Sequence, residues 1–404
     1  MKKIGILTFH RSYNYGAFMQ CYSLSARIAR DFPNCKVEVI DYCTRRMYEN
    51  YPTSFFPFVL GPKEKRNSAK QIVRQVGKCV LDLDTLKRKR ELYHGFDEER
   101  ITLPLSPFQM VSDEYEELFR IIDENYDILI VGSDAVWEYK TYPFPNAYYP
   151  NYDFKRTKLM SYAASADRMH SSELTQENRE YIKGTLDRFS YIGIRDIATQ
   201  NFLTSVSEDF ILNHNCDPTA FVDFENMPRS LDRVKSVLMN AGIDINKPIV
   251  GIMGNNESCN MLRRMFGDKY QIVSVYQHTK AADFNFDYLT PFEWARIFSL
   301  FSVTVTKYFH GSMLSLRNGT PTIATDYWFK VKEDHTTKIG DLYTRLGLED
   351  HYFYMSEVGH DSKEMKEKIE YYIHYPDTNR IIDSVERESE TYESFRKALK
   401  RMLG

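Results

Sequence analysis

The chain has 404 residues, enough for about two domains of ordinary size. Hydrophobic residues make up 43% and charged residues 27%, as in folded globular proteins, and the net charge of −3 does not favour a nucleic acid as partner. No apolar run approaches the roughly 20 residues of a membrane span, and the six cysteines form no Cys-x-x-Cys pair. We therefore expect no membrane span, no metal site and a reducing, cytoplasmic location.

The first predicted elements form a strand–helix–strand unit. Residues 4–9 are an apolar run typical of a buried strand, residues 17–30 carry apolar side chains at helical spacing, and residues 37–41 indicate a second strand. Such a unit implies a parallel sheet. Residues 44–125 follow as a less regular, partly helical insertion, which begins with an aromatic, Pro-rich loop at residues 51–62.

Strands and helices alternate along the rest of the chain. We expect strands at residues 126–131, 158–164, 191–195, 249–253, 270–276, 302–306 and 321–325. We expect helices at residues 175–189, 196–203, 291–301 and 313–317, and a charged helical tail from about residue 362. The pattern predicts two α/β halves in series, each with a parallel sheet. Because ligands bind beyond the carboxyl ends of such strands, we expect a small-molecule site in a cleft between the halves.

The first candidate site loop follows the first strand and has the sequence Asn14-Tyr15-Gly16-Ala17-Phe18-Met19-Gln20. Gly16 would let backbone N–H groups approach a ligand closely, and a helix that begins here would favour an anion. The alternative is that Gly16 serves the geometry of the turn alone. Asn14, Tyr15 and Gly16 are candidate substrate-binding residues on the first interpretation.

The second candidate loop, Gly132-Ser133-Asp134, ends the strand at residues 126–131. Asp134 could simply cap a following helix. On the functional interpretation, Ser133 and Asp134 face the cleft, and Asp134 accepts a proton from a substrate hydroxyl.

The third candidate is His310, which stands between a predicted strand and a predicted helix, with Gly311 and Ser312 after it. This position would expose the imidazole at the end of the sheet, beside backbone N–H groups that suit an anion. An imidazole has an ordinary pKa of about 6.5, so it can give or take a proton near neutral pH. The sequence therefore indicates His310 as a general acid or base.

Two cations lie near the ends of predicted strands. Arg195 could bind a phosphate as a planar fork, and the alternative is an ion pair with Asp196 or Glu208. Lys307 precedes His310, but strand alternation places these two side chains on opposite faces unless the loop turns.

Six motifs in the expected order resemble the polysaccharide pyruvyl transferase family and span roughly residues 4–350. They are Asn14-Tyr15-Gly16-Ala17-x-x-Gln20, Val131-Gly132-Ser133-Asp134-x-x-Trp137, Ser161-Tyr162-Ala163-Ala164-Ser165, Ile194-Arg195-Asp196, Asp217-Pro218-Thr219 and Phe309-His310-Gly311-Ser312. The chain departs from the family where Lys307-Tyr308 replaces the common Asp-Ser, which turns the local charge from negative to positive. It departs again at Ala135 and Glu138, where the family often has Gln and Asn.

The resemblance implies a glycosyltransferase-B-like fold, an α/β protein with two Rossmann-like domains facing across a cleft. The predicted domains are residues 1–225 on the acceptor side, residues 226–360 with the Phe-His-Gly-Ser motif, and residues 361–404 as helices that pack back on the first domain. The implied donor substrate is phosphoenolpyruvate, with no separate cofactor and no metal. The implied acceptor is a sugar or lipid-linked glycan with two nearby hydroxyls, and the product is a cyclic pyruvate ketal.

Within this scheme His310 is the acid/base and Asp134 is a base or a hydroxyl anchor. Arg195, with Lys307 as the weaker candidate, holds the donor's phosphate and carboxylate, and the loops at Gly16 and Gly311 donate N–H groups. Peripheral contact with a membrane-bound acceptor and a homo-oligomeric state are both compatible with the sequence.

Two alternatives stay open. A nucleotide-sugar glycosyltransferase of the same fold would need a carboxylate pair in the second half, and Asp326 and Asp334 have such spacing. A catalytically silent glycan-binding member of the family would fit the unusual Lys307-Tyr308 pair.

Overall fold

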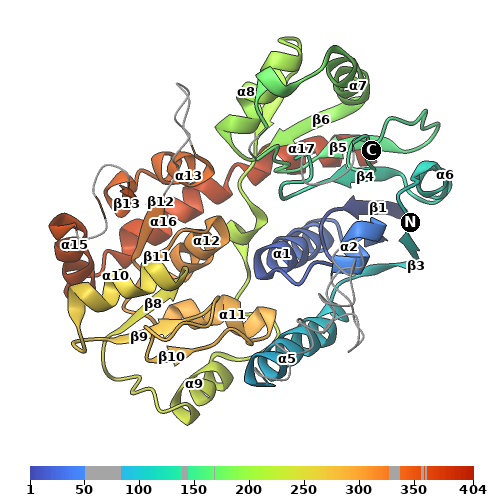
Figure 1. Ribbon diagram of the computed structural model, residues 1–404. Helices are drawn as coiled ribbons and strands as arrows, with labels where there is room; N and C mark the ends of the chain where they lie inside the picture. The colour runs from blue at the N-terminus through green and yellow to red at the C-terminus, as the bar shows by residue number, and fades with distance from the viewer. Residues whose placement is uncertain (51–82, 139–143, 168, 327–336, 356–358, 360–361) are drawn as a thin grey trace, which may run out of the picture.

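The computed structural model describes the chain except residues 51–82, 139–143, 168, 327–336, 356–358 and 360–361. Within the described residues, the strands form two parallel sheets, with the orders β3-β2-β1-β4-β5-β6-β7 and β10-β9-β8-β11-β12-β13 (Figure 1). The aromatic loop predicted at residues 51–62 lies outside the described residues.

The first sheet belongs to the N-terminal half. Its strands are β1 Lys2–Leu7, β2 Cys35–Cys43, β3 Leu105–Val111, β4 Ile128–Val131, β5 Lys158–Ser161, β6 Phe189–Ile194 and β7 Leu212–His214. Its helices are α1 Tyr15–Asp31, α2 Arg45–Asn50, α5 Leu83–Arg100, α6 Glu116–Asn125, α7 Gln176–Leu186 and α8 Ile197–Val206, with the short 3₁₀ turns η2 Ser171–Glu173 and η3 Pro218–Phe221. Strand order reverses between β1 and β4, as in doubly wound folds.

The second sheet repeats this arrangement. Its strands are β8 Ile249–Met253, β9 Gln271–Ser274, β10 Phe284–Asn285, β11 Val303–Thr306, β12 Thr322–Asp326 and β13 Tyr352–Tyr354. The helices are α9 Leu231–Asn240, α10 Asn256–Phe266, α11 Pro291–Ile297, α12 Phe309–Arg317, α13 Lys338–Leu346, α15 Lys363–His374, α16 Thr378–Ser389 and α17 Tyr392–Leu403, with 3₁₀ turns η4 Phe298–Leu300 and η5 Glu349–His351. The central strands β8 and β11 are buried along their whole length, which explains their unbroken apolar and β-branched sequences.

The two halves meet through aromatic side chains of α1 and α11. The ring of Tyr15 stacks on Trp294 with 4.7 Å between ring centroids, and its hydroxyl donates to the carbonyl of Leu289 at 2.8 Å. Phe18 packs edge-on against Phe292, one turn further along α1. Burial of these large rings holds the start of α1 against the second half.

The C-terminal helices do not all pack as predicted. In Figure 1 the red helices α16 and α17 run from the second sheet to the first. On α17, Phe395 packs against Tyr162 and Tyr191 of the N-terminal half. Helix α15 instead packs against the second sheet, because its apolar face, with Met365 and Ile369, belongs to the core beside β11.

The structure also corrects two predicted helix starts. Helix α1 begins at Tyr15 and α12 at Phe309, so most of the first candidate loop, as well as His310, Gly311 and Ser312, lies in first turns of helices instead of loops. The connections before these helices are shorter than the sequence pattern suggested.

Candidate active site

Three strands of the first sheet end in charged residues. Strand β4 runs into Asp134, β6 is followed directly by Arg195, and Asp217 comes shortly after β7. Isolated bridges join Asp134 to Ala164 and Ala164 to Ile194, so the parallel pairing continues beyond β4. These side chains therefore meet at the carboxyl edge of the first sheet.

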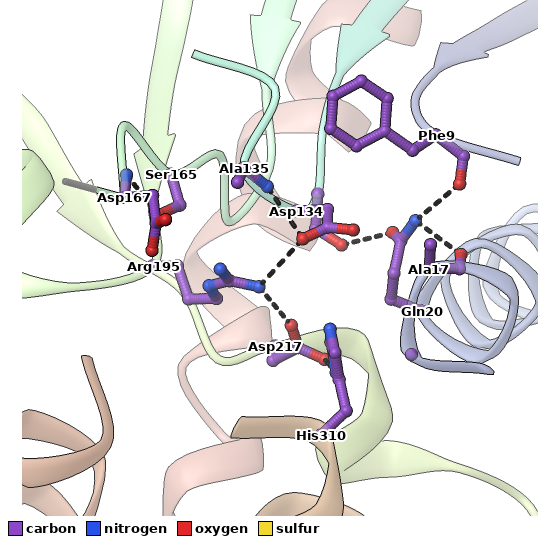
Figure 2. Close-up of polar contacts among 12 residues, drawn as sticks. Phe9, Ala17, Gln20, Asp134, Ala135, Ser165, Asp167, Arg195, Asp217 and His310 are labelled. Atoms are coloured by element: carbon purple, nitrogen blue, oxygen red, sulfur yellow. Dashed lines mark hydrogen bonds and ion pairs between the residues drawn. The ribbon is translucent and has the colours of Figure 1, made fainter. Parts of the chain in front are cut away.

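Arg195 is the centre of this group, with its side chain 1% exposed. Its Nη1 atom lies 2.9 Å from Oδ2 of Asp217 and 3.7 Å from Oδ1 of Asp134 (Figure 2). Its Nε atom lies 3.7 Å from Asp196, and its guanidinium lies over the ring of Phe309. Burial alone would lower the pKa of Arg195, but these carboxylates outweigh burial and raise it.

The predicted role of Arg195 as a phosphate fork gains no support from this geometry and stays a prediction. The ion-pair alternative describes the side chain better, with Asp217 as the closest partner and Asp196 as a more distant one. A guanidinium enclosed by carboxylates has little surface to offer an anionic ligand, and its ion pairs join the side chains of Asp134 and Asp217.

Asp217 links this group to the second half. Its Oδ1 accepts hydrogen bonds from the backbone N–H and the hydroxyl of Thr219, and the same atom lies 3.7 Å from Nδ1 of His310. Burial would raise the pKa of Asp217, but the neighbouring His310 and Arg195 lower it. Asp217 thus stays ionised and faces the imidazole.

His310 lies in the first turn of α12 and points at the carboxylates of the N-terminal half (Figure 2). Its side chain is 15% exposed, so the ring is neither sealed in the core nor free in solvent. Burial lowers the pKa of His310, while the negative charges of Asp217 and Asp134 act in the opposite direction. The imidazole is therefore neutral at rest, with carboxylates at hand to stabilise its protonated form.

Gly16 packs directly against this imidazole. A Cβ atom at Gly16 would overlap Cδ2 and Cγ of His310, so the absence of a side chain is what lets α1 approach the ring. Its N–H group, however, donates to Oδ1 of Asn14 at 2.9 Å, and that of Ala17 donates to the same atom at 3.2 Å. The predicted roles of Asn14 and Gly16 are corrected accordingly: Asn14 caps α1, and Gly16 makes room for His310.

The start of α12 differs from that of α1. Within the described residues, no side chain caps α12, whose N-cap residue is Tyr308. Gly311 lets this first turn pack closely on Met253 and Thr306, because a Cβ atom there would collide with both. The first-turn N–H groups of α12 are therefore the N–H donors that the site retains for an anion.

The other predicted binding residues make contacts within the protein. Ser133 is fully buried and donates to Gln20 at 2.5 Å, and Tyr15 is committed to the contact with α11. Ser312 is fully buried beside the Tyr343 hydroxyl. Lys307 is half-buried, with its ammonium 5.7 Å from the centre of the Tyr308 ring.

The sequence interpretation did not assign site roles to Asp217 or Lys338. Asp217 belongs to a motif that was recognised, and its place after a strand could have marked it, but the three-residue strand β7 gives no clear apolar pattern. Lys338 begins α13, and its ammonium lies 2.7 Å from Asp167 of the N-terminal half. No local pattern reveals a pair so far apart in the chain.

Of the two carboxylates that a nucleotide-sugar enzyme would use, the structure describes Asp326. Oδ2 of Asp326 accepts hydrogen bonds from Thr337 at 2.5 Å and from Tyr352 at 3.2 Å, and Asp334 lies outside the described residues. Across the part of the chain that the structure describes, no group of three His, Cys, Asp or Glu side chains could hold a metal ion. Among those residues there is also no helix of the length and apolarity needed to cross a membrane.

Solved structures with the same architecture define the fold class. UDP-GlcNAc 2-epimerase from Neisseria meningitidis bound to UDP-GlcNAc matches with a TM-score of 0.54 at 8% identity, covering 99% of this chain and 100% of that one. The S. aureus MnaA-UDP co-structure matches with a TM-score of 0.51 at 9% identity, covering 100% and 97%. At this identity the likeness concerns the fold alone, and together with the two sheets it defines an α/β protein of two Rossmann-like domains with a glycosyltransferase-B-like arrangement.

The family is established by sequence. The family model named "Polysaccharide pyruvyl transferase" matches residues 14–328, which include the ends of β4, β6 and β7 and the start of α12. Comparison with curated protein sequences gives no significant match. The chain belongs to the polysaccharide pyruvyl transferase family.

Proposed function

We propose that the protein transfers the pyruvyl group of phosphoenolpyruvate to two neighbouring hydroxyls of a sugar, on a surface polysaccharide or its lipid-linked precursor in the cytoplasm. The observation that carries the proposal is the position of His310. An imidazole on the second domain faces Asp134 and Asp217 of the first (Figure 2), beside a helix start that no described side chain caps, in a chain of this family.

The reaction requires one proton transfer to carbon and two C–O bonds. The methylene carbon of phosphoenolpyruvate takes up a proton and becomes the methyl group, while one sugar hydroxyl adds to the neighbouring carbon. The bond from that carbon to the phosphate oxygen then breaks, and the second hydroxyl adds in its place. The two hydroxyls release two protons. One replaces the proton that the methylene carbon has taken up, and the other leaves with inorganic phosphate.

The residue chemistry suits these steps. Protonated His310 gives its proton to the methylene carbon, and an anionic donor beside the ring, with Asp217 and Asp134, favours that protonated form. Asp134 accepts the proton of the attacking hydroxyl. The Asp134 carboxylate is itself held by Arg195, whose Nη1 atom lies 3.7 Å from it. The first-turn N–H groups of α12 bind an anionic group of the donor.

The test is phosphate release from phosphoenolpyruvate in the presence of a panel of glycans, with the ketal product identified by mass spectrometry. We expect turnover with a glycan that carries a suitable diol, and a loss of roughly 10²–10⁴-fold in kcat for His310→Gln, the usual contribution of a general acid. Full activity of that variant would remove His310 from the chemistry.

Parallel reactions with UDP- and CMP-sugars test the glycosyltransferase alternative. Donor hydrolysis from these compounds, with none from phosphoenolpyruvate, would overturn the proposal. Glycan binding without turnover of any donor would instead assign the chain to the catalytically silent class.

A further inference from the structure

The donor in the proposed reaction carries two anionic groups, a carboxylate and a phosphate, and the described site has few cations free to meet them. The charge of Arg195 is shared among Asp134, Asp196 and Asp217. His310 is neutral at rest because burial lowers its pKa. Among the described residues, we therefore look for a second anion-binding group besides the first turn of α12.

Lys338 is placed to be that group. Its side chain is 33% exposed, and it stands at the start of α13, three residues before a contact of that helix with the segment that follows Arg195. The helix that carries it is well fixed: the Thr337 hydroxyl accepts the N–H of Gly340 at 2.9 Å. Further along α13, Asp341 accepts the N–H of Ile197, the first residue of α8, at 3.3 Å. Lys338 is thus held at the junction between the halves.

Among the described residues, Lys338 pairs with a carboxylate of the N-terminal half. Oδ1 of Asp167 lies 2.7 Å from Nζ, and the Asp167 side chain is 18% exposed. Asp167 lies just beyond Ser165, whose hydroxyl accepts its N–H at 3.0 Å, and its backbone has a φ of +49° (Figure 2). Ser165 in turn donates to Asp196, a neighbour of Arg195, so the ion pair borders the site.

We propose that Lys338 binds the phosphate or carboxylate of the donor, and that Asp167 holds the ammonium in place until the donor replaces it. The inference rests on the proposed function for the identity of the donor. The ion pair is half-buried and keeps access to solvent, and phosphate is itself a strong hydrogen-bond acceptor for an ammonium, so a doubly charged phosphate can replace the single carboxylate.

The experiment is calorimetric titration of the full chain with phosphoenolpyruvate and, separately, with inorganic phosphate. Lys338→Met keeps the length of the side chain and removes its charge, and we expect Kd to rise roughly tenfold or more, as for loss of a hydrogen bond to a charged group. Lys338→Arg should restore most of the affinity. Asp167→Asn should bind the donor as tightly as the wild type or several-fold tighter, because the competing carboxylate is gone.

The opposite signs at the two positions separate the proposal from a purely structural ion pair. If Lys338→Met and Asp167→Asn weaken binding alike, the pair merely joins the two domains and the inference is wrong. An unchanged Kd in Lys338→Met also overturns it. The matched control is Lys183→Met, at an ion pair with Asp187 of 2.9 Å on the surface of α7, which should leave Kd unchanged.

The two probes distinguish this inference from the proposed function. A wild-type chain that binds inorganic phosphate but not phosphoenolpyruvate contradicts the proposed function, and Lys338 is then judged on the phosphate titration. A chain that binds neither overturns both.

Discussion

The starts of α1 and α12 meet at the site, and they perform different tasks. Helix α1 is capped by Asn14, which occupies the N–H groups of Gly16 and Ala17. Helix α12 has no side-chain cap within the described residues and carries His310 in its first turn. Both helices follow a strand of a parallel sheet. At the start of α1 the Asn14 side chain already occupies the backbone N–H groups, whereas at the start of α12 they stand beside the imidazole of His310 without a described side-chain cap. The comparison teaches that a Gly near a helix start is not by itself a sign of anion binding.

The largest expected effect removes the acid/base from α12. His310→Gln keeps a polar side chain of similar size, and kcat should fall by roughly 10²–10⁴-fold. Steady-state kinetics with saturating phosphoenolpyruvate and acceptor measure this. The buried histidine His351, bound to Asp377 away from the site, provides the control: His351→Gln should act on stability and not on the chemical step.

A smaller loss of kcat is expected when a methyl group is added to α1 beside the imidazole. Gly16→Ala places a methyl group where the imidazole lies, and a displacement of about 1 Å at a catalytic group can cost roughly 100-fold in rate. The same substitution at Gly184, a helical position of α7 with open space around it, is the matched control and should leave kcat unchanged. Equal activity of the two variants would show that α1 does not position His310.

The contact between Asp217 and the His310 of α12 can be tested through the pH dependence of kcat. Its charge raises the pKa of His310, so Asp217→Asn should lower that pKa further. Because the reaction uses the protonated imidazole, the decline of kcat with rising pH should move to lower pH. The pH–rate profile measures this shift, and Asp377→Asn, beside His351, should leave the profile in place. A profile that moves upward in Asp217→Asn would contradict the role of His310 as an acid.

The smallest effect concerns the cap of α1. Asn14→Ala should lower the free energy of unfolding by about 1 kcal/mol, the usual value for loss of an N-cap side chain. Urea denaturation measures it, and Asn14→Asp should keep most of the stability because Asp also accepts from the helix N–H groups. If Asn14→Ala leaves the free energy of unfolding unchanged and weakens donor binding, Asn14 binds the ligand instead of stabilising the helix.

Much of the fold could be predicted because its signals are local. Buried parallel strands such as β4, β8 and β11 are built from apolar and β-branched residues without charges, so each was found within a residue or two. Strands β3, β7, β10 and β13 were missed, and each is an edge strand: β3 contains Pro107, and the other three have only two or three residues. At such edges burial is too weak to impose an apolar pattern.

For the site, the sequence by itself determined that His310 and Asp134 stand at the carboxyl ends of strands. The tertiary structure decided which groups meet there: Asp217 facing His310, Arg195 enclosed by carboxylates, and Lys338 beside Asp167. It also decided that Asn14 occupies the helix N–H groups that Gly16 was expected to offer. The physical reason is the separation in sequence of the residues that interact. The end of a strand is marked by residues next to it in the sequence, whereas the partner of a charged side chain is set by packing between distant segments.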